Sequence, residues 1–303
     1  HVQCAAPTKA GTYTVTIDVT ESAKYAAAED LHGENWTFTI APETVSSDKI
    51  TITGLESGYI YTGAAIEPVP KVTVDGKELT LNTDYTVAYK NNIAIGKATV
   101  TVTLKGNYSG SRDAQFLISY GHASDRMYTL PESSDGWYSG TLEVKAASGY
   151  KIGETPDSFS DKLTISGDTA RGSRQIFLKA ADGKVYSTIL QYKIDSEAPQ
   201  NVKIQYNKSG FKSLLNKITF GKFFKETINV EASAEDSLSG VDEIHYFAAY
   251  SVVENVNNIS ASEWETSLSI APNAKRFIYV KVTDKAGNST ILLDQGVVAY
   301  TLS

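Results

Sequence analysis

The sequence predicts an all-β protein built from tandem β-sandwich modules, and three observations support this. Apolar and polar residues alternate in short runs such as Thr99–Leu104, so one face of each strand is buried and the other faces water. Turn signals such as Asp75-Gly76 separate these runs, because glycine tolerates the positive φ that a tight hairpin needs. The third observation is an internal repeat.

The repeat joins two segments near the start of the chain. Gly11–Val19 matches Gly96–Leu104 without a gap. Each copy is followed by a tyrosine and then by an aromatic-x-Ile end, which are Tyr25 with Phe38–Ile40, and Tyr108 with Phe116–Ile118. A repeat of this kind indicates a string of similar structural units. It also places residue 1 inside the first of them.

Proline and small polar residues interrupt the strand pattern at 41–47, 119–121 and 195–199. These interruptions predict four parts, which are 1–42 (the C-terminal part of a truncated module), 43–119, 120–197 and 198–303. The first part is too short for a sandwich, and a lone pair of strands is marginal in water. We expect it to pack on its neighbour, to pair with another chain, or to follow upstream strands of its own module. The short junctions predict an elongated rod with limited hinge motion.

Composition excludes several classes of function. The net charge is −7, and the densest basic stretch, Lys217–Lys225, holds only three lysines, which argues against nucleic-acid binding. A single cysteine, Cys4, rules out an internal disulfide. No apolar run reaches the roughly 18 residues of a membrane span.

The predicted second module resembles a bacterial Ig-like repeat that is frequent in large surface proteins of Gram-positive bacteria. The resemblance covers almost the whole module. The matching positions include Gly54-Leu55, Tyr61-Thr-Gly63, Asp84-Tyr85-Thr-Val87, Asn91-Asn92, Gly106-Asn-Tyr108-Ser-Gly110 and Phe116-Leu-Ile118.

The last two predicted modules are similar to other Ig-like spacers of such proteins. The positions are Trp137, Gly149-Tyr150 and Tyr192-Lys-Ile-Asp195-x-x-Ala198-Pro199 in the third, with Phe223-Phe224, Asp236-x-x-Ser239-Gly240-Val241 and Asp284-x-Ala286-Gly287-Asn288 in the fourth. The resemblance implies Ig-like sandwiches at an extracellular, cell-wall-associated location. These families are mostly stalks, spacers and adhesive regions, so no catalytic residue is carried over.

The residues themselves predict no enzyme and no cofactor. Zinc-protease, nucleophile-elbow and phosphate-loop motifs are missing, and the four histidines are scattered. His245 lies in a predicted strand, where a surface or hydrogen-bonded role is more common than a ligand role. A glycosidase would need two carboxylates at a fixed separation, which one sequence cannot reveal. A Lys–Asn isopeptide bond stays open, although no spacing selects its residues.

Asp236, Asp242 and Asp284 are the best metal candidates. Calcium takes six or more oxygen ligands, often carboxylates and loop carbonyls, and these loops could meet at one end of a sandwich. The favoured alternative is that Asp236 and Asp284 accept backbone N–H bonds in their own turns, as Asx residues do. We therefore predict no metal, with calcium as the hypothesis to test.

Trp36, Trp137 and Trp264 could form a platform for stacking sugars. Aromatic residues on strands more often pack in cores or against neighbouring strands, and that is the favoured interpretation. Ligand-binding residues are therefore unknown at this level.

The sequence predicts a non-catalytic stalk or adhesion segment of a large bacterial surface protein. Its partners would be neighbouring domains and a protein or glycan ligand, contacted through edge strands. The alternative is an accessory, carbohydrate-binding region of a secreted glycan-degrading enzyme. A flanking catalytic domain would favour that alternative, while a wall-sorting signal would favour the stalk.

Overall fold

The computed structural model describes residues 6–206, 227–271 and 275–298. Cys4, the stretch Lys217–Lys225 and the Phe223-Phe224 element lie outside the described residues. The all-β prediction is confirmed: the helical elements in these ranges are short 3-10 turns, η1 (Ser47–Lys49), η2 (Asp125–Met127), η3 (Val256–Asn258) and η4 (Ala261–Glu263).

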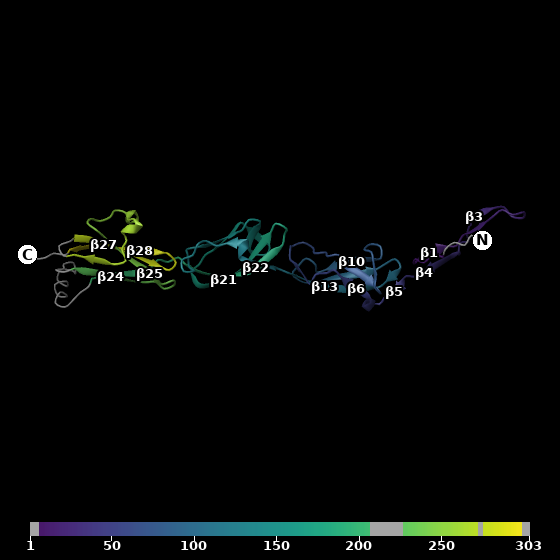
Figure 1. The fold of residues 1–303 in the computed structure, drawn as a ribbon, viewed down its shortest axis with the longest axis horizontal. Coiled ribbons are helices and arrows are strands. Elements are labelled where there is room, and N and C mark those ends of the chain that lie inside the picture. The colour runs from purple at the N-terminus through teal and green to yellow at the C-terminus, as the bar shows by residue number, and fades with distance from the viewer. Residues whose placement is uncertain (1–5, 207–226, 272–274, 299–303) are drawn as a thin grey trace, which may run out of the picture. The chain divides into compact units, whose positions relative to one another are not determined.

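The chain forms two compact units. Figure 1 labels the strands along the chain. The first contains residues His1–His122 and Ala180–Tyr186, and the second contains Ala123–Lys179 and Ser187–Ser303. The four-part division predicted from the sequence is finer than this, and its boundaries stay a prediction, as does the rod.

The first unit contains a complete β-sandwich. Its strands are β5 (Glu43–Thr44), β6 (Ile50–Thr53), β7 (Gly58–Ile60), β8 (Lys71–Val74), β9 (Lys77–Glu78), β10 (Tyr85–Lys90), β11 (Gly96–Leu104), β12 (Tyr108–Ser109) and β13 (Ser111–Ser119). One sheet has the order β10-β11-β13-β7, and the other has the order β6-β8-β9. β7 runs parallel to β13, whereas β10 and β11 pair antiparallel.

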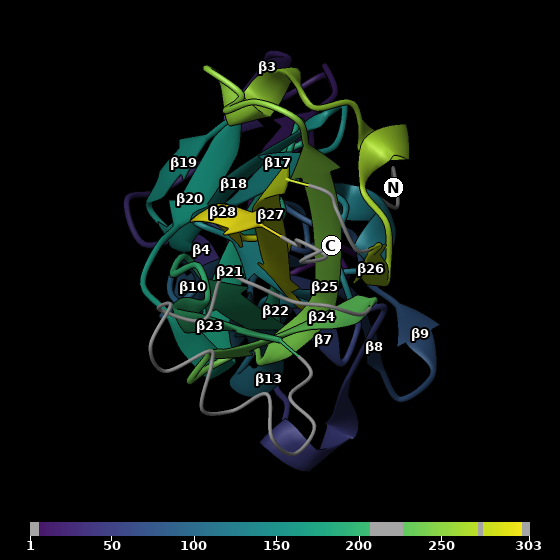
Figure 2. The ribbon, with the colours of Figure 1, turned by 90° about the vertical axis from the view of Figure 1, so that its left-hand side faces the viewer.

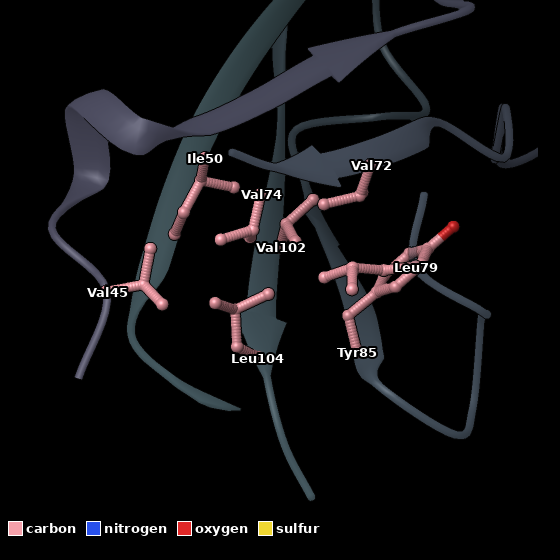
Figure 3. Packing of buried hydrophobic residues seen from close by; sticks show 8 residues of the cluster. All are labelled: Val45, Ile50, Val72, Val74, Leu79, Tyr85, Val102 and Leu104. Carbon is pink, nitrogen blue, oxygen red and sulfur yellow. The ribbon is translucent and has the colours of Figure 1, made fainter. Parts of the chain in front are cut away.

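The alternation of apolar residues produces the core of this sandwich. Val102 of β11 is fully buried, and it faces Ile50 and Val74 of the opposite sheet in Figure 3. The hydroxyl group of Tyr85 donates a hydrogen bond to the Pro70 carbonyl at 2.8 Å, so the buried phenol is satisfied. The cluster consists of Val45, Ile50, Val72, Val74, Leu79, Tyr85, Val102 and Leu104.

The repeat seen in the sequence is also a repeat of strand register. The strands before the sandwich are β1 (Gly11–Thr14), β2 (Ile17–Val19), β3 (Ala28–Leu31) and β4 (Thr37–Ile40). β1 pairs antiparallel with β4 so that Gly11 lies opposite Ile40. β11 pairs with β13 in the same way, with Gly96 opposite Ile118. We call residues 11–40 the first ribbon.

The second unit begins with two further sheets. The strands are β15 (Tyr128–Thr129), β16 (Tyr138–Ser139), β17 (Leu142–Ala146), β18 (Tyr150–Thr155), β19 (Ser158–Ser160), β20 (Lys162–Ile165), β21 (Thr169–Ala180) and β22 (Val185–Asp195); the short β14 (Gly121–His122) belongs to the first unit. β22, β21, β18 and β19 follow one another in one sheet, with β16 parallel to β22, and β15-β17-β20 form the other.

The remaining strands form another two-layered sandwich. They are β23 (Gln200–Tyr206), β24 (Ile228–Glu235), β25 (Val241–Ala249), β26 (Leu268–Ile270), β27 (Lys275–Asp284) and β28 (Ser289–Val298). Figure 2 shows β28, β27 and β25 side by side in one layer, and β23-β24-β26 form the second sheet. The core between them contains Ile228, Val230, Tyr246, Ile270, Ile278, Val280 and Val282.

Candidate functional site

Three carboxylates meet at the end of β22. Asp195 is the last residue of β22, Asp236 follows β24, and Asp284 is the last residue of β27. One carboxylate oxygen from each lies within 4.8 Å of the others. Asp195 and Asp284 are each only 1% exposed, so two of these charges are almost fully removed from water.

The structure brings two of the three sequence candidates together and places the third elsewhere. Asp236 and Asp284 converge as expected for loops at one end of a sandwich. Asp242 is an exposed residue near the start of β25, outside this group. Asp195 joins instead, although sequence reasoning gave it no role as a ligand. Its only signal was its place in the Tyr192-Lys-Ile-Asp195 motif, at the end of a long apolar strand.

Asp236 and Asp284 both accept N–H groups of the turns that follow them. An Asp236 oxygen accepts the backbone N–H groups of Leu238 and Gly240. Asp284 accepts the backbone N–H of Asn288 at 2.8 Å, and Asp284 Oδ2 accepts the Asn288 side-chain amide at 2.9 Å. These contacts are those expected of Asx turns. They also offset the cost of burying the carboxylates.

Asp195 connects β22 to the sandwich that follows it. One carboxylate oxygen accepts the backbone N–H of Glu197 at 3.1 Å. The other accepts the N–H of Ser239, in the loop between β24 and β25, at 3.0 Å. Because Asp195 is buried, these bonds to a charged acceptor lie in a low-dielectric setting, where they are stronger than at the surface.

Asn288 completes the connection from the loop between β27 and β28. Its side-chain amide donates to the carbonyl of Asp195 at 2.9 Å and to that of Glu197 at 3.3 Å. The hydroxyl of Ser139 donates to Asn288 Oδ1. We call the hydrogen-bonded group of Asp195, Ser239, Asp284 and Asn288 the joint clasp.

The carboxylates of Asp195, Asp236 and Asp284 could supply some of the oxygen ligands of a divalent cation. Three acidic groups this close repel one another, and a divalent ion would relieve that repulsion. The hydroxyl of Ser239, a residue 7% exposed, has no hydrogen-bond partner among the described residues. However, a cation would compete with the N–H donors for the same oxygens. The hydrogen bonds fit the Asx-turn interpretation, and calcium binding stays a hypothesis.

The tryptophans are used mainly for packing. Trp137 is only 7% exposed, and the Lys193 ammonium lies 5.4 Å from its ring centroid. Trp264 packs against Phe247 with ring centroids 6.0 Å apart. Trp36, in the first ribbon, is 44% exposed. A hollow of about 390 Å³ lies beside Trp137, lined also by Tyr138, Ser139, Thr141 and residues 131–134.

His245 has an ordinary environment. It lies on β25, with Nδ1 3.7 Å from a Glu243 carboxylate oxygen. The residue is half-buried there and stands outside the group of three carboxylates. In the ranges that the structure describes, no helix is both long and apolar enough to cross a membrane.

Comparisons with known proteins give only distant structural similarity. No family model and no curated protein matches the sequence. Fibronectin(III)-like modules of Clostridium thermocellum CbhA match 57% of this chain and 95% of theirs, with 13% identity and a TM-score of 0.32. A 1.5-MDa bacterial ice-binding adhesin matches 86% of this chain and 95% of the solved chain, with 11% identity and a TM-score of 0.28.

A third solved structure, a Ca2+-stabilized adhesin of an Antarctic bacterium, matches 86% of this chain and 74% of its own, with 13% identity and a TM-score of 0.27. Similarity this distant carries no argument about ligands or partners.

Proposed function

We propose that this chain is a non-catalytic extracellular segment of a large bacterial surface protein, acting as a stalk, an adhesive region or both. The observation that supports this most is the joint clasp, because it holds two successive sandwiches of the second unit together through buried polar contacts. A segment that must keep distant domains apart under load needs joints of this kind more than it needs a reactive site.

The clasp restrains the connection between β22 and β23 from two sides. Only residues 196–199 separate these strands, and Pro199 fixes one backbone torsion within them. The Asp195 carboxylate binds the β24–β25 loop, and the Asn288 amide binds the carbonyls of Asp195 and Glu197. Thr290 adds a hydroxyl bond of 2.6 Å to the Pro199 carbonyl. Bending at this connection would break several of these bonds at once.

The location and the mechanical role can be tested separately. Antibodies against this segment should label intact cells of the source bacterium, with the label lost after brief protease treatment of whole cells. In single-molecule pulling, the segment should extend in discrete unfolding steps. Labelling only after lysis would contradict the extracellular role, and smooth extension at low force would contradict the mechanical one.

The alternative is an accessory, carbohydrate-binding region of a secreted glycan-degrading enzyme. The hollow beside Trp137 and Tyr138 favours it, because its lining combines an aromatic edge with hydroxyl groups. The burial of the Trp137 ring weakens it, since sugar stacking needs an open aromatic face. Binding on a glycan array that is lost in Tyr138→Ala and kept in Tyr250→Ala would support this alternative; an array without binding would leave the stalk.

A further inference from the structure

The apolar side chains of the first ribbon are exposed where their counterparts in the second copy are buried. Val15 and Ile17 are 44% and 48% exposed. The gap-free repeat aligns them with Val100 and Val102, which are both 0% exposed. The same residue types in the same pattern therefore form a core in one copy and a surface in the other.

The aromatic end of the repeat shows the same contrast. Phe38 is 42% exposed and stacks on Tyr13 with ring centroids 5.5 Å apart. Its counterpart Phe116 is 3% exposed and packs edge-on against Tyr59. No residue between positions 6 and 44, all of which the structure describes, is buried. Several large apolar side chains exposed together on one short ribbon are typical of an interaction surface.

The second copy shows what covers such a face. Val102 of β11 packs with Ile50, Val72 and Val74 of β6 and β8. Phe116 and Ile118 of β13 pack instead with Tyr59 of β7, with Ile66 and with Tyr89 of β10. β10 extends the sheet beside β11. The strands that contribute these covering residues, β6, β7, β8 and β10, all precede Gly96 in the chain.

We propose that the first ribbon is half of a β-sandwich and docks a β-sheet segment with the sequence pattern of residues 45–90. The repeat places this segment on the N-terminal side of Gly11, just as residues 45–90 lie on the N-terminal side of Gly96. The interface would be of the kind already formed inside the complete sandwich, because the register of β1 with β4 repeats that of β11 with β13. This inference does not depend on the extracellular role.

A second copy of this chain is a less suitable occupant. Its own residues 45–90 are engaged in their sandwich, where Ile50 and Val72 are 0% exposed. Releasing them would expose the core of that sandwich, so exchange between two copies gains no buried area. A segment of the same polypeptide carries no such cost.

The test supplies the missing half from the protein itself. In the full chain, residues 43–95 are duplicated and joined ahead of Gly11 in place of residues 1–10. Amide hydrogen exchange at Val15 and Phe38 should then slow by at least about tenfold, towards the rates of Val100 and Phe116. The emission of Trp36 should shift to the blue. Comparing the graft with its Trp36→Phe variant separates the emission of Trp36 from that of the other two tryptophans. Unchanged exchange at Val15 and Phe38 in a graft whose residues 96–118 remain protected would overturn the proposal.

Two matched substitutions separate docking from misfolding. Ile17→Asp places a charge on the apolar face. Thr16→Asp places it at the adjacent exposed position, which the repeat aligns with Thr101 on the outer face of β11. In the graft, Ile17→Asp should abolish the new protection and Thr16→Asp should keep it. In the ungrafted chain, neither should change the unfolding midpoint of residues 43–119. A lower midpoint for Ile17→Asp alone, or concentration-dependent dimers that protect Val15, would show another occupant and overturn the proposal.

Discussion

Asn288→Ala should weaken the joint between β22 and the final sandwich more than an ordinary polar substitution does. The side chain contacts four partners: its two N–H groups are shared among acceptors of Asp195, Glu197 and Asp284, and its Oδ1 accepts from Ser139. Neutral bonds contribute about 1 kcal/mol each and one to a carboxylate about 1.5–3 kcal/mol. Asn288 is half-buried, so water can replace some of these hydrogen bonds when the side chain is removed. We therefore expect a net loss of about 2–4 kcal/mol in the free energy of unfolding.

The assay is amide hydrogen exchange on the full chain, followed at Glu197 and Ser239, together with urea unfolding. Both amides donate to Asp195, and they should exchange faster when Asn288 no longer holds that strand end. Asn229→Ala is the matched control, because that exposed side chain accepts a single bond from Ser269. Equal losses of stability in the two variants, or an unchanged exchange rate of the Ser239 amide, would contradict this role of the joint clasp.

Three further outcomes are expected. Ile50→Ala should cost about 2–5 kcal/mol of unfolding free energy by urea titration, whereas Ile17→Ala should cost less than about 1 kcal/mol, since only Ile50 is fully buried. Excess calcium should shift the calorimetric midpoint by less than about 1 °C, because N–H groups already occupy the Asp oxygens; a larger shift, reversed by chelation, would establish the metal site. Burial and the hydrogen bond to Asp294 raise the pKa of Tyr206, so its stabilising contribution is complete below the unfolded pKa of about 10 and is lost as pH rises further. Tyr206→Phe should therefore flatten the loss of stability above that pH, and an unchanged alkaline profile would contradict this.

The strands were predictable because local sequence sets them. Alternation in Thr99–Leu104 produces the inward valines of β11. Asp75 and Gly76 both adopt positive φ, of 46° and 80°, between β8 and β9, as the hairpin signal predicts.

The site was predictable only in part, because its members come from distant strands. Asp236 and Asp284 lie in turns with recognisable Asx chemistry, so their local hydrogen bonds could be foreseen. Asp195 ends a strand of the preceding sandwich, and its bond to Ser239 spans 44 residues. Nothing local indicates that pairing. The exposure of Val15 was equally hidden, because alternation marks an apolar face without telling what covers it.

We expect the joint clasp to fix how two successive sandwiches of the second unit are held. Spin labels at Thr164→Cys on β20 and Glu231→Cys on β24, in a Cys4→Ser background, measure this directly by electron double resonance. Both positions are exposed, so the labels should not disturb the cores. The distance between the two labels should have one narrow distribution, and this distribution should broaden in Asn288→Ala. A broad distribution in the unaltered protein, unchanged by Asn288→Ala, would contradict it.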